Sequence, residues 1–590
     1  MDSLNNEVSS LSSVNTWTSD VSRRSKDNEV EAIVPQENCS ERSEIRQSNR
    51  DSNGGDKIAE KDLNSLLFNK FELEDAYKIK TNNLAEHSSH HSHRSHGTLR
   101  SPEEDIAQSA ISKVFTNRST GGLSLPPDGG YGWVCCGCLT AVFLSTWGAS
   151  AGSGIFIAYY LNANAFPGAS KYDYALIAGF NVFGGQGFAP TAMILAQIIG
   201  FRATMCTGVI FLFAGFFLAS FATKLWQLYL TQGVLFGLGI ALVFVPATTI
   251  LPGWFLKKRS TAFGMSLLGT GAGGVIYSIA AQEMISRTGD QRWALRMLAF
   301  LCAGVCAVAT LLLRQRVPSK PVGFKSWKAI EQQFALIFQW RIAKAYKINL
   351  ISLWSTFALF GYNLMVFTLS AYGLSRGLST KQSSLLTVIL NAAQCIGRPC
   401  IGVIGDRYGR VNTTVVLTTV LVIFLFSFWI TAHTFVQLVM FCICIGLCIG
   451  VGNVMNIVLI ADISGADDFL PAWGYCNTFT SPFLLLSEVI AQALVSHQNQ
   501  SKPYLHVQIF AGLCFFVALI LVLLLRETII KLRFQEALSD VDRALKKTLQ
   551  DLENSAEAAN ELGSKRALYE RILQPKLSFF FRRMFYRKKI

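Results

Sequence analysis

The sequence predicts an all-α membrane protein with twelve transmembrane helices in two six-helix halves, preceded by a disordered cytosolic N-terminal tail. Hydrophobic residues make up 51% of the 590 residues and charged residues 16%, whereas soluble domains carry about 25% charged residues. Twelve apolar segments between residues 134 and 525 are each long enough to cross about 30 Å of hydrocarbon at about 1.5 Å per residue. They lack the strict alternation of a transmembrane β-strand, so we expect a helical bundle.

Residues 1–125 form the first region, a tail rich in Ser, Asn, Glu and Arg. The tail has too little apolar sequence to bury a core, and we expect it to be disordered. It also lacks the apolar stretch of a signal peptide, so its expected location is the cytosol. A histidine cluster at residues 87–96 has no carboxylate or thiol at ligand spacing nearby. We therefore predict a solvated patch there, and neither a metal nor a cofactor for the chain.

The membrane body follows the tail. Its predicted spans are residues 134–160, 174–199, 203–222, 226–249, 260–285, 293–313, 348–372, 382–404, 412–432, 435–460, 470–495 and 504–525. Residues 314–347, between the sixth and seventh spans, contain eight Lys or Arg and one acid, Glu331. This central loop separates an N-terminal half, residues 126–313, from a C-terminal half, residues 348–525. Two such halves are typical of parallel-repeat transporters.

Loop charges predict the orientation of the helices. With a cytosolic N-terminus, the cytosolic loops hold fourteen Lys or Arg and the opposite loops hold seven. Because basic loops favour the cytosolic side, both termini are expected there. The C-terminal tail, residues 526–590, is basic and ends with the aromatic and basic run 579–589. Such a run suits an anionic inner leaflet, and a solvated tail is the alternative. We attribute the net charge of +14 to the membrane surface rather than to nucleic acid.

The junction between the tail and the first span reads Pro-Pro-Asp-Gly-Gly-Tyr-Gly-Trp at residues 126–133. From physical chemistry alone it is a turn with an interfacial anchor, because glycines permit tight turns and aromatic rings suit the water–lipid boundary. It also resembles the opening signature of the monocarboxylate-porter family, a branch of the major facilitator superfamily. The matching residues are Asp128, Gly129, Gly130, Gly132 and Trp133. This resemblance, closest to fungal members with long polar tails, implies the major facilitator fold and alternating access.

Two loops at the expected cytosolic face extend the resemblance. Gly-Asp-Arg-Tyr-Gly-Arg at residues 405–410 is similar to the major facilitator loop pattern, whose charges latch neighbouring helices in one conformation. Residues 254–264 are similar to the monocarboxylate-porter pattern of aromatic residues and a basic triplet. With the entry motif, the charged residues of the predicted inner gate are Asp406, Arg407, Arg410, Lys257, Lys258 and Arg259. The sequence leaves open whether the triplet faces lipid headgroups or the opposite half.

Arg398 is the strongest candidate for solute binding. A guanidinium near mid-membrane costs at least about 2.5 kcal/mol to insert, so we expect it to face a polar cavity or a partner. Residues 394–399 resemble the family's eighth-span motif, in which an acid couples a proton and the arginine holds the substrate carboxylate. Here Gln394 replaces the acid, and the family's first-span lysine falls on Ala151, one turn after Trp147. Both coupling groups are missing, so we expect uniport or weak proton linkage.

Other polar residues inside the spans complete the predicted solute path. The further candidates for solute contact are Gln394, Gln186, Trp147, Asn391 and Asn453. Glu488 in the eleventh span is the candidate for proton coupling, and a role in the outer gate or in helix packing is the alternative. We expect no direct pair with Arg398, because the span ends place the two residues at different depths. Each amide alone is more often an interhelical hydrogen bond than a solute contact.

The functional hypothesis is a secondary transporter for a small organic solute, monocarboxylate-like or otherwise anionic, in the plasma membrane or the vacuolar membrane. The alternatives are a transporter-like nutrient sensor that signals through its cytosolic tails, and a carrier of another cargo such as riboflavin, which resemblance to fungal members also allows. The expected partners are the solute and the lipid bilayer. We do not expect an enzyme, because outside the membrane the sequence has no zinc pattern, nucleophile elbow or phosphate-binding loop.

Overall fold

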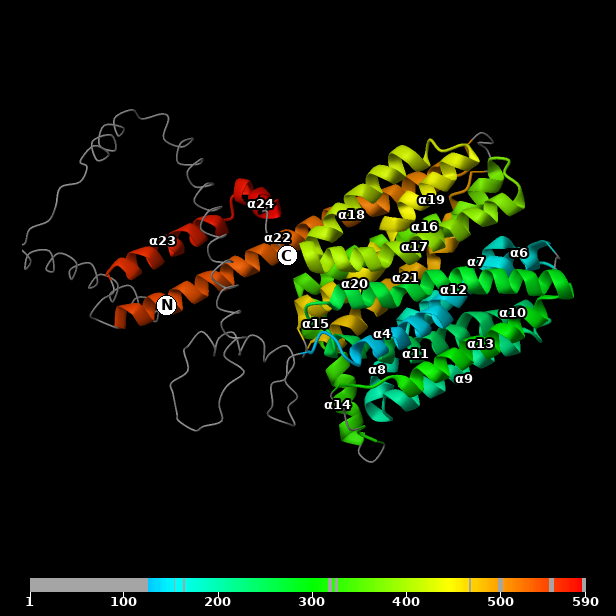
Figure 1. Ribbon diagram of the computed structural model, residues 1–590, viewed down its shortest axis with the longest axis horizontal. Coiled ribbons are helices and arrows are strands. Elements are labelled where there is room, and N and C mark those ends of the chain that lie inside the picture. Colours follow the sequence, from blue (N-terminus) through cyan, green and yellow to red (C-terminus); the bar gives the residue numbers. More distant parts are fainter. Residues whose placement is uncertain are drawn as a thin grey trace, which may run out of the picture. The chain divides into compact units, whose positions relative to one another are not determined.

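A computed structural model describes residues 126–152, 154–162, 165–316, 321–323, 327–465, 468–496, 502–550 and 556–585. The predicted N-terminal tail, residues 1–125, lies outside the described residues together with its histidine cluster, and so do residues 586–590. Within the described ranges every regular element is a helix, and the helices of the membrane body run side by side (Figure 1). The predicted helical membrane fold is confirmed.

The N-terminal half extends from α4 to α13. In chain order its helices are α4 (Gly132–Phe143), η2 (Leu144–Gly148), α5 (Ala149–Ala151), α6 (Gly154–Asn162), α7 (Lys171–Gly187), α8 (Ala189–Ile198), α9 (Phe201–Ala219), α10 (Leu225–Leu228), η3 (Tyr229–Leu235), α11 (Phe236–Ile250), η4 (Leu251–Gly253), α12 (Arg259–Thr288) and α13 (Gln291–Leu312). The first and fourth spans consist of consecutive pieces because π-type turns interrupt the regular α-helical hydrogen bonds.

The C-terminal half extends from α16 into α22. Its helices are α16 (Tyr346–Ser375), α17 (Thr380–Tyr408), α18 (Arg410–Phe424), η5 (Leu425–Trp429), α19 (Phe435–Ile449), α20 (Val451–Ser464), α21 (Phe469–Ala493) and α22 (Leu505–Gln550). One residue, Gly409, separates α17 from α18, and its φ of 104° is a conformation that glycine adopts without a Cβ penalty. This abrupt turn brings the end of α17 next to the first residue of α18.

Ten helices in the described part of the chain are long and apolar enough to cross a membrane. The other two predicted spans are also helical. Residues 174–199 form α7 and α8, which are divided at Phe188 just before Pro190, so neither piece reaches the full length of a span. Residues 470–495 form α21, whose average hydropathy is lowered by the polar residues Asn477, Thr480, Ser481, Ser487 and Glu488.

The halves meet most extensively along two helix pairs, α12 with α17 and α7 with α21. Both pairs approach closely at glycines. A Cβ atom on Gly402 of α17 would lie 2.3 Å from the carbonyl oxygen of Ser260 in α12, and one on Gly179 of α7 would lie 2.2 Å from that of Leu485 in α21. Small residues allow such close approach of membrane helices. The halves therefore meet along backbones rather than through long side chains at these points.

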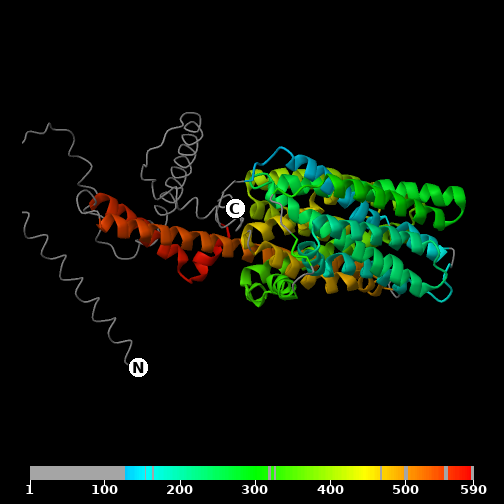
Figure 2. The same cartoon turned by 90° about the horizontal axis from the view of Figure 1, so that it is seen from below.

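Helices also occupy the two polar regions at the borders of the halves. The predicted central loop, residues 314–347, contains α14 (Trp327–Ile337) and α15 (Trp340–Lys344). The predicted C-terminal tail begins within α22, which continues beyond the membrane body because no Gly or Pro interrupts residues 526–550. Two further helices follow, α23 (Ala556–Leu573) and α24 (Leu577–Met584). Both views show α22 extending from one end of the bundle (Figures 1 and 2).

Candidate functional site

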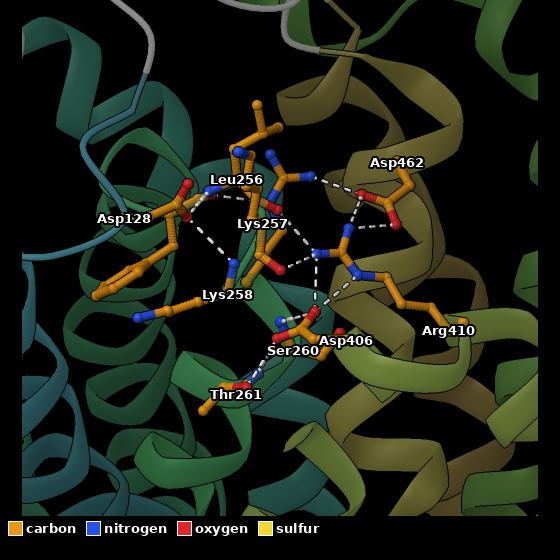
Figure 3. Close-up of polar contacts among 12 residues, drawn as sticks. Asp128, Leu256, Lys257, Lys258, Ser260, Thr261, Asp406, Arg410 and Asp462 are labelled. Carbon is orange, nitrogen blue, oxygen red and sulfur yellow. Dashed lines mark hydrogen bonds and ion pairs between the residues drawn. The ribbon is translucent and has the colours of Figure 1, made fainter. Parts of the chain in front are cut away.

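A cluster of four charged residues joins the two halves at one end of the bundle (Figure 3). This charged cluster consists of Arg259, Asp406, Arg410 and Asp462. At its centre, the carboxylate of Asp462 in the last turn of α20 accepts a hydrogen bond of 2.8 Å from Arg259 Nη1 and one of 2.7 Å from Arg410 Nη1. Arg259 begins α12 in the N-terminal half and Arg410 begins α18 in the C-terminal half. One carboxylate is thus shared by a guanidinium from each half.

Asp406, at the end of α17, caps a helix of the opposite half. Its carboxylate accepts from the backbone N–H groups of Ser260 (3.2 Å) and Thr261 (2.8 Å), and from the Thr261 hydroxyl (2.8 Å). These are first-turn N–H groups of α12, which have no partner within the helix, and Lys258 at the N-cap position makes no side-chain cap. A carboxylate at this end also complements the helix dipole. Arg410 Nε donates to Asp406 at 3.1 Å and orients it.

Asp128 of the entry motif holds the loop that leads into α12. Its Oδ1 accepts from the backbone N–H groups of Leu256 (2.7 Å) and Lys258 (3.1 Å), while its own N–H donates to the carbonyl of Trp254 (3.1 Å). Arg410 Nη2 donates to the carbonyl of Leu256 at 2.8 Å from the other side. The loop is therefore fixed within its own half by Asp128 and bound to the opposite half by Arg410.

The small residues and tryptophan of the entry motif pack on the same loop. A Cβ on Gly132 would lie 3.0 Å from the Cβ of Trp254, and the ring of Trp133 meets that of Phe255 edge-on with centroids 4.9 Å apart. The carbonyl of Gly129 accepts a hydrogen bond from the N–H of Gly132, and Gly130 has a φ of 61°. The motif thus forms a turn that brings Asp128 to residues 254–258.

The three residues of the basic triplet, 257–259, have different surroundings in the structure. Arg259 is 2% exposed and faces the opposite half through Asp462. The side chains of Lys257 and Lys258 are exposed. Arg407 is also exposed and lies over the ring of its neighbour Tyr408, 5.7 Å from the centroid. The structure therefore brings Asp406, Arg410 and Arg259 of the predicted gate together, and places Lys257, Lys258 and Arg407 on the surface around it.

Asp462 was not among the site residues predicted from the sequence. The available signal was its position, since it is an acid at the end of an apolar span on the same side of the bundle as Arg410. Sequence spacing alone gave no reason to pair it with Arg259, 203 residues earlier.

Arg398 is buried inside α17, with 1% of its surface exposed. Its Nη2 donates to Gln394 Oε1 at 2.6 Å and to the Tyr362 hydroxyl at 3.5 Å, and its Nη1 donates across the halves to the carbonyl of Leu267 in α12 at 2.8 Å. Gly450 makes room for it, because a Cβ there would lie 2.7 Å from Arg398 Cγ. Every partner of this guanidinium in the described part of the chain is uncharged.

Two hydrogen-bond donors, one on Arg398 and one on its neighbour Gln394, lack an acceptor among the described residues. Within the described residues, neither Arg398 Nε nor Gln394 Nε2 makes a hydrogen bond, although both are buried. Buried donors normally have partners, because leaving one unsatisfied costs about 1–3 kcal/mol. Arg398, Gln394 and Tyr362 therefore form a central donor group that an acceptor-rich molecule would satisfy, and a negatively charged acceptor would also compensate the guanidinium.

The remaining predicted contact residues lie on several helices. Asn391, one turn before Cys395, packs against the glycines of α12, with its Nδ2 3.2 Å from the position of a Cβ on Gly274. Trp147 meets Phe244 edge-on at 5.8 Å between centroids and also touches Gly185, the neighbour of Gln186. Asn453 is half-buried on α20. None of these side chains bonds to Arg398, whose hydrogen-bond partners within the described ranges are Gln394, Tyr362 and the carbonyl of Leu267.

Glu488 is buried in α21, with 6% of its surface exposed, and its Oε1 makes no hydrogen bond within the described residues. The neighbouring hydroxyl of Ser487 donates to the carbonyl of Leu484 at 2.7 Å and accepts from Asn363 Nδ2 at 3.5 Å. Glu488 and Arg398 are not paired, as expected from their depths. Nor do the described residues contain a group of three or more His, Cys, Asp or Glu arranged to hold a metal ion.

Two overlapping stretches, residues 136–481 and 377–581, match the family described as the Major Facilitator Superfamily. The chain belongs to this superfamily. Its curated relatives include the "Uncharacterized transporter ESBP6" of Saccharomyces cerevisiae, 49% identical over 516 residues, which cover 87% of this chain and 77% of the relative. They also include the "Probable transporter MCH2" of the same yeast, 31% identical over 404 residues, which cover 68% of this chain and 84% of the relative.

Solved structures of the superfamily show the same fold. The fucose transporter FucP in its outward conformation superimposes with a TM-score of 0.50 at 13% identity, covering 67% of this chain and 99% of that one. The proton:xylose symporter XylE gives a TM-score of 0.50 at 14% identity, covering 66% and 94%. The chain is therefore a multi-pass membrane protein of a transporter superfamily, and its described spans are the helices of a major facilitator fold.

Proposed function

We propose that this major facilitator protein carries a small organic anion, of the monocarboxylate-like kind, across its membrane. The observation that supports the anion is the central donor group. Arg398 is buried with uncharged partners only, and Arg398 Nε and Gln394 Nε2 are donors without acceptors among the described residues. A carboxylate beside Arg398 would supply an acceptor and neutralise the guanidinium, since hydrogen bonds between arginine and a carboxylate are charge-assisted and strong.

The position of Arg398 supports coupling between binding and conformation. Its guanidinium extends from α17 of one half to the Leu267 carbonyl on α12 of the other. A solute that binds Arg398 therefore competes for, or adds to, a contact between the halves. A ligand shifts a conformational equilibrium only if it interacts differently with the two states. A residue that already bridges the halves provides such a difference.

The charged cluster supports alternating access by closing one end of the bundle. Opening that end requires the Arg259–Asp462 pair, the Asp406 cap on α12 and the Arg410 bond to the Leu256 carbonyl to break together. Because the basic loops favour the cytosol, we assign this end to the cytosolic side. The conformation described here is then closed to the cytosol, and both termini lie on that side.

The surroundings of Arg398 support uniport or weak proton linkage. Gln394, hydrogen-bonded to Arg398, is an amide that gains and loses no proton, and Ala151 offers no amine. The carrier would then follow the solute gradient, with the arginine charge compensated by the solute itself.

Uptake by purified protein in liposomes tests the proposal, with small monocarboxylates compared against neutral molecules of the same shape. Arg398→Ala should lower initial uptake about tenfold or more, because a charge-assisted hydrogen bond contributes about 1.5–3 kcal/mol. Arg398→Lys should restore only part of it, since a point charge cannot replace the planar fork. Arg287→Ala is the matched control, because Arg287 is exposed near the end of α12 opposite Arg259, where it forms an ion pair with Glu283 on the same helix.

Each outcome of this experiment is informative. Wild-type uptake by Arg398→Ala, or a preference for the neutral molecules, would overturn the anion proposal. Saturable binding of a carboxylate without any uptake would overturn the carrier and favour the nutrient sensor.

A further inference from the structure

After leaving the membrane body, the chain folds back and packs against the part of α22 that follows residue 525. The part of α22 beyond residue 525 packs against α23, with the rings of Phe534 and Tyr569 5.8 Å apart and Arg566 Nε 3.0 Å from Asp542. The turn after α23 then returns the chain to the beginning of this extension. There Arg583 of α24 forms a 2.7 Å ion pair with Glu527 of α22, and both side chains are more than nine-tenths buried.

This ion pair places α24 level with the ends of two spans. Arg526, next to Glu527, donates to the carbonyl of Met584 in α24 and, at 3.0 Å, to the side chain of Asn412 in the first turn of α18. Asn412 is the first residue of the ninth predicted span, and Arg526 directly follows the last residue of the twelfth. The helix α24 contacts the end of the twelfth span directly, and it contacts the start of the ninth span through Arg526. It therefore lies at the membrane boundary rather than away from it.

The side chains at the end of α24 have different surroundings. Arg583 and Met584 are buried against the chain, whereas Phe581 is 49% exposed and Phe585 is 65% exposed. Residues four apart lie on the same face of a helix, so the two rings form one apolar face. The segment 574–590 also contains six Lys or Arg and no Asp or Glu. A helix with exposed aromatic rings among basic residues, at the level of the boundary, matches the chemistry of an anionic lipid surface.

We propose that α24 is an interfacial anchor that binds the anionic cytosolic leaflet. Phe581 and Phe585 enter the boundary between headgroups and acyl chains, and the basic side chains of the described segment that are not buried, Lys576 and Arg582, interact with lipid phosphates and carboxylates. The Glu527–Arg583 pair ties the anchor to α22, and Arg526 ties it to α18. The anchor therefore holds the ends of two C-terminal-half spans at the lipid surface. It depends on the proposed orientation of the termini but not on the proposed solute.

Hydrogen–deuterium exchange of the full-length protein tests the anchor. The protein is placed in lipid nanodiscs of pure phosphatidylcholine or of a mixture rich in phosphatidylserine, and exchange is followed in peptides that cover residues 574–585. Exchange should be several-fold slower with phosphatidylserine, and added salt should remove the difference, because salt screens attraction to anionic headgroups. The double variant Phe581→Glu/Phe585→Glu should lose the lipid-dependent protection.

Leu532→Glu provides the matched control, since Leu532 is an exposed apolar residue of α22 that lies outside α24. This variant should keep the protection. Equal exchange in the two lipids would overturn the anchor. So would protection that appears only when discs contain two copies of the chain, since the phenylalanine face would then be an interface between copies. If the double variant also exposes the residues around Glu527, Arg582→Gln replaces it, because that change removes one basic residue and leaves the buried pair intact.

Discussion

At the scale of single residues, Asp462 is the point on which the closed end depends. It is the one carboxylate in the charged cluster that binds arginines from both halves, and it is absent from the sequence motifs that predicted the gate. Asp406 and Arg410 could be predicted because a short loop pattern holds them close together in sequence. The contact of Asp462 with Arg259 spans 203 residues, so only the fold creates it.

Asp462→Asn should loosen the closed end. The amide keeps one acceptor oxygen but loses the charge, which weakens the attraction between this side chain and the almost fully buried Arg259. The expected loss is on the order of 1–3 kcal/mol of the stability of the closed conformation. Hydrogen–deuterium exchange in residues 254–262 should become faster. Asp290→Asn is the control, because Asp290 caps α13 through the N–H of Arg292 in an exposed loop. Unchanged exchange in Asp462→Asn would show that the other cross-half bonds suffice.

The amide of Gln394 leads to a prediction about how uptake depends on pH. Wild-type uptake should depend weakly on external pH, because the amide cannot titrate. Gln394→Asp should lower uptake at neutral pH, since a carboxylate one helical turn from Arg398 would compensate the guanidinium and compete with the solute. Initial rates at two external pH values measure both effects. Strong stimulation of the wild type by acid that disappears in Glu488→Gln would instead assign the proton to Glu488.

At the scale of helices, the close approach of α12 and α17 follows from glycines. The sequence contains several glycines in the fifth span, but it does not show which helix each one faces, because helical periodicity reveals a face and not its neighbour. In the structure Gly264 of α12 meets the carbonyl of Arg398 in α17 and Gly402 of α17 meets Ser260, whereas Gly269 of α12 faces the first span. Likewise, the apolar pattern predicted the extent of the second span but not its division at Phe188, which depends on a local backbone conformation.

Gly402→Ala should push these two helices apart. A Cβ would lie 2.3 Å from a backbone oxygen, which cannot move away as the end of a side chain could. Overpacking of this kind costs about 1–3 kcal/mol, so the melting temperature of the purified protein should fall. Gly304→Ala in α13 is the control, because nothing lies within 4 Å of its added methyl group. A melting temperature equal to that of the control would mean that α12 and α17 separate without cost.

At the scale of the whole molecule, the sequence predicted the fold well because membrane spans are read from length and apolarity, which are local properties. Prediction from these local properties failed at the end of the twelfth span. There the apolar pattern stops at residue 525 but the helix does not, and the fold-back of α24 depends on a buried ion pair between Glu527 and Arg583. The sequence indicated the basic and aromatic character of that end, and the structure adds where it packs.

Protease-accessible tags at Met1 and Ile590 test the orientation of the whole chain. Both tags should be protected in sealed right-side-out vesicles and cut after the vesicles are permeabilised, because the loop charges place both termini in the cytosol. A tag inserted after Gly289, in the loop between α12 and α13, should be cut without permeabilisation. Cleavage of only one terminal tag in sealed vesicles would contradict an even number of spans.

The shared carboxylate of Asp462 has a consequence for how salt affects the transport cycle. While the end is closed, the two arginines and two aspartates of the charged cluster sum to zero. If the halves separate between α12 and α17, the cluster divides into Arg259, which contributes +1, on one half and Asp406, Arg410 and Asp462, which together contribute −1, on the other. Mobile ions stabilise separated charges at an aqueous opening more than they stabilise the buried neutral cluster. Raising the ionic strength on that side should therefore favour the open state.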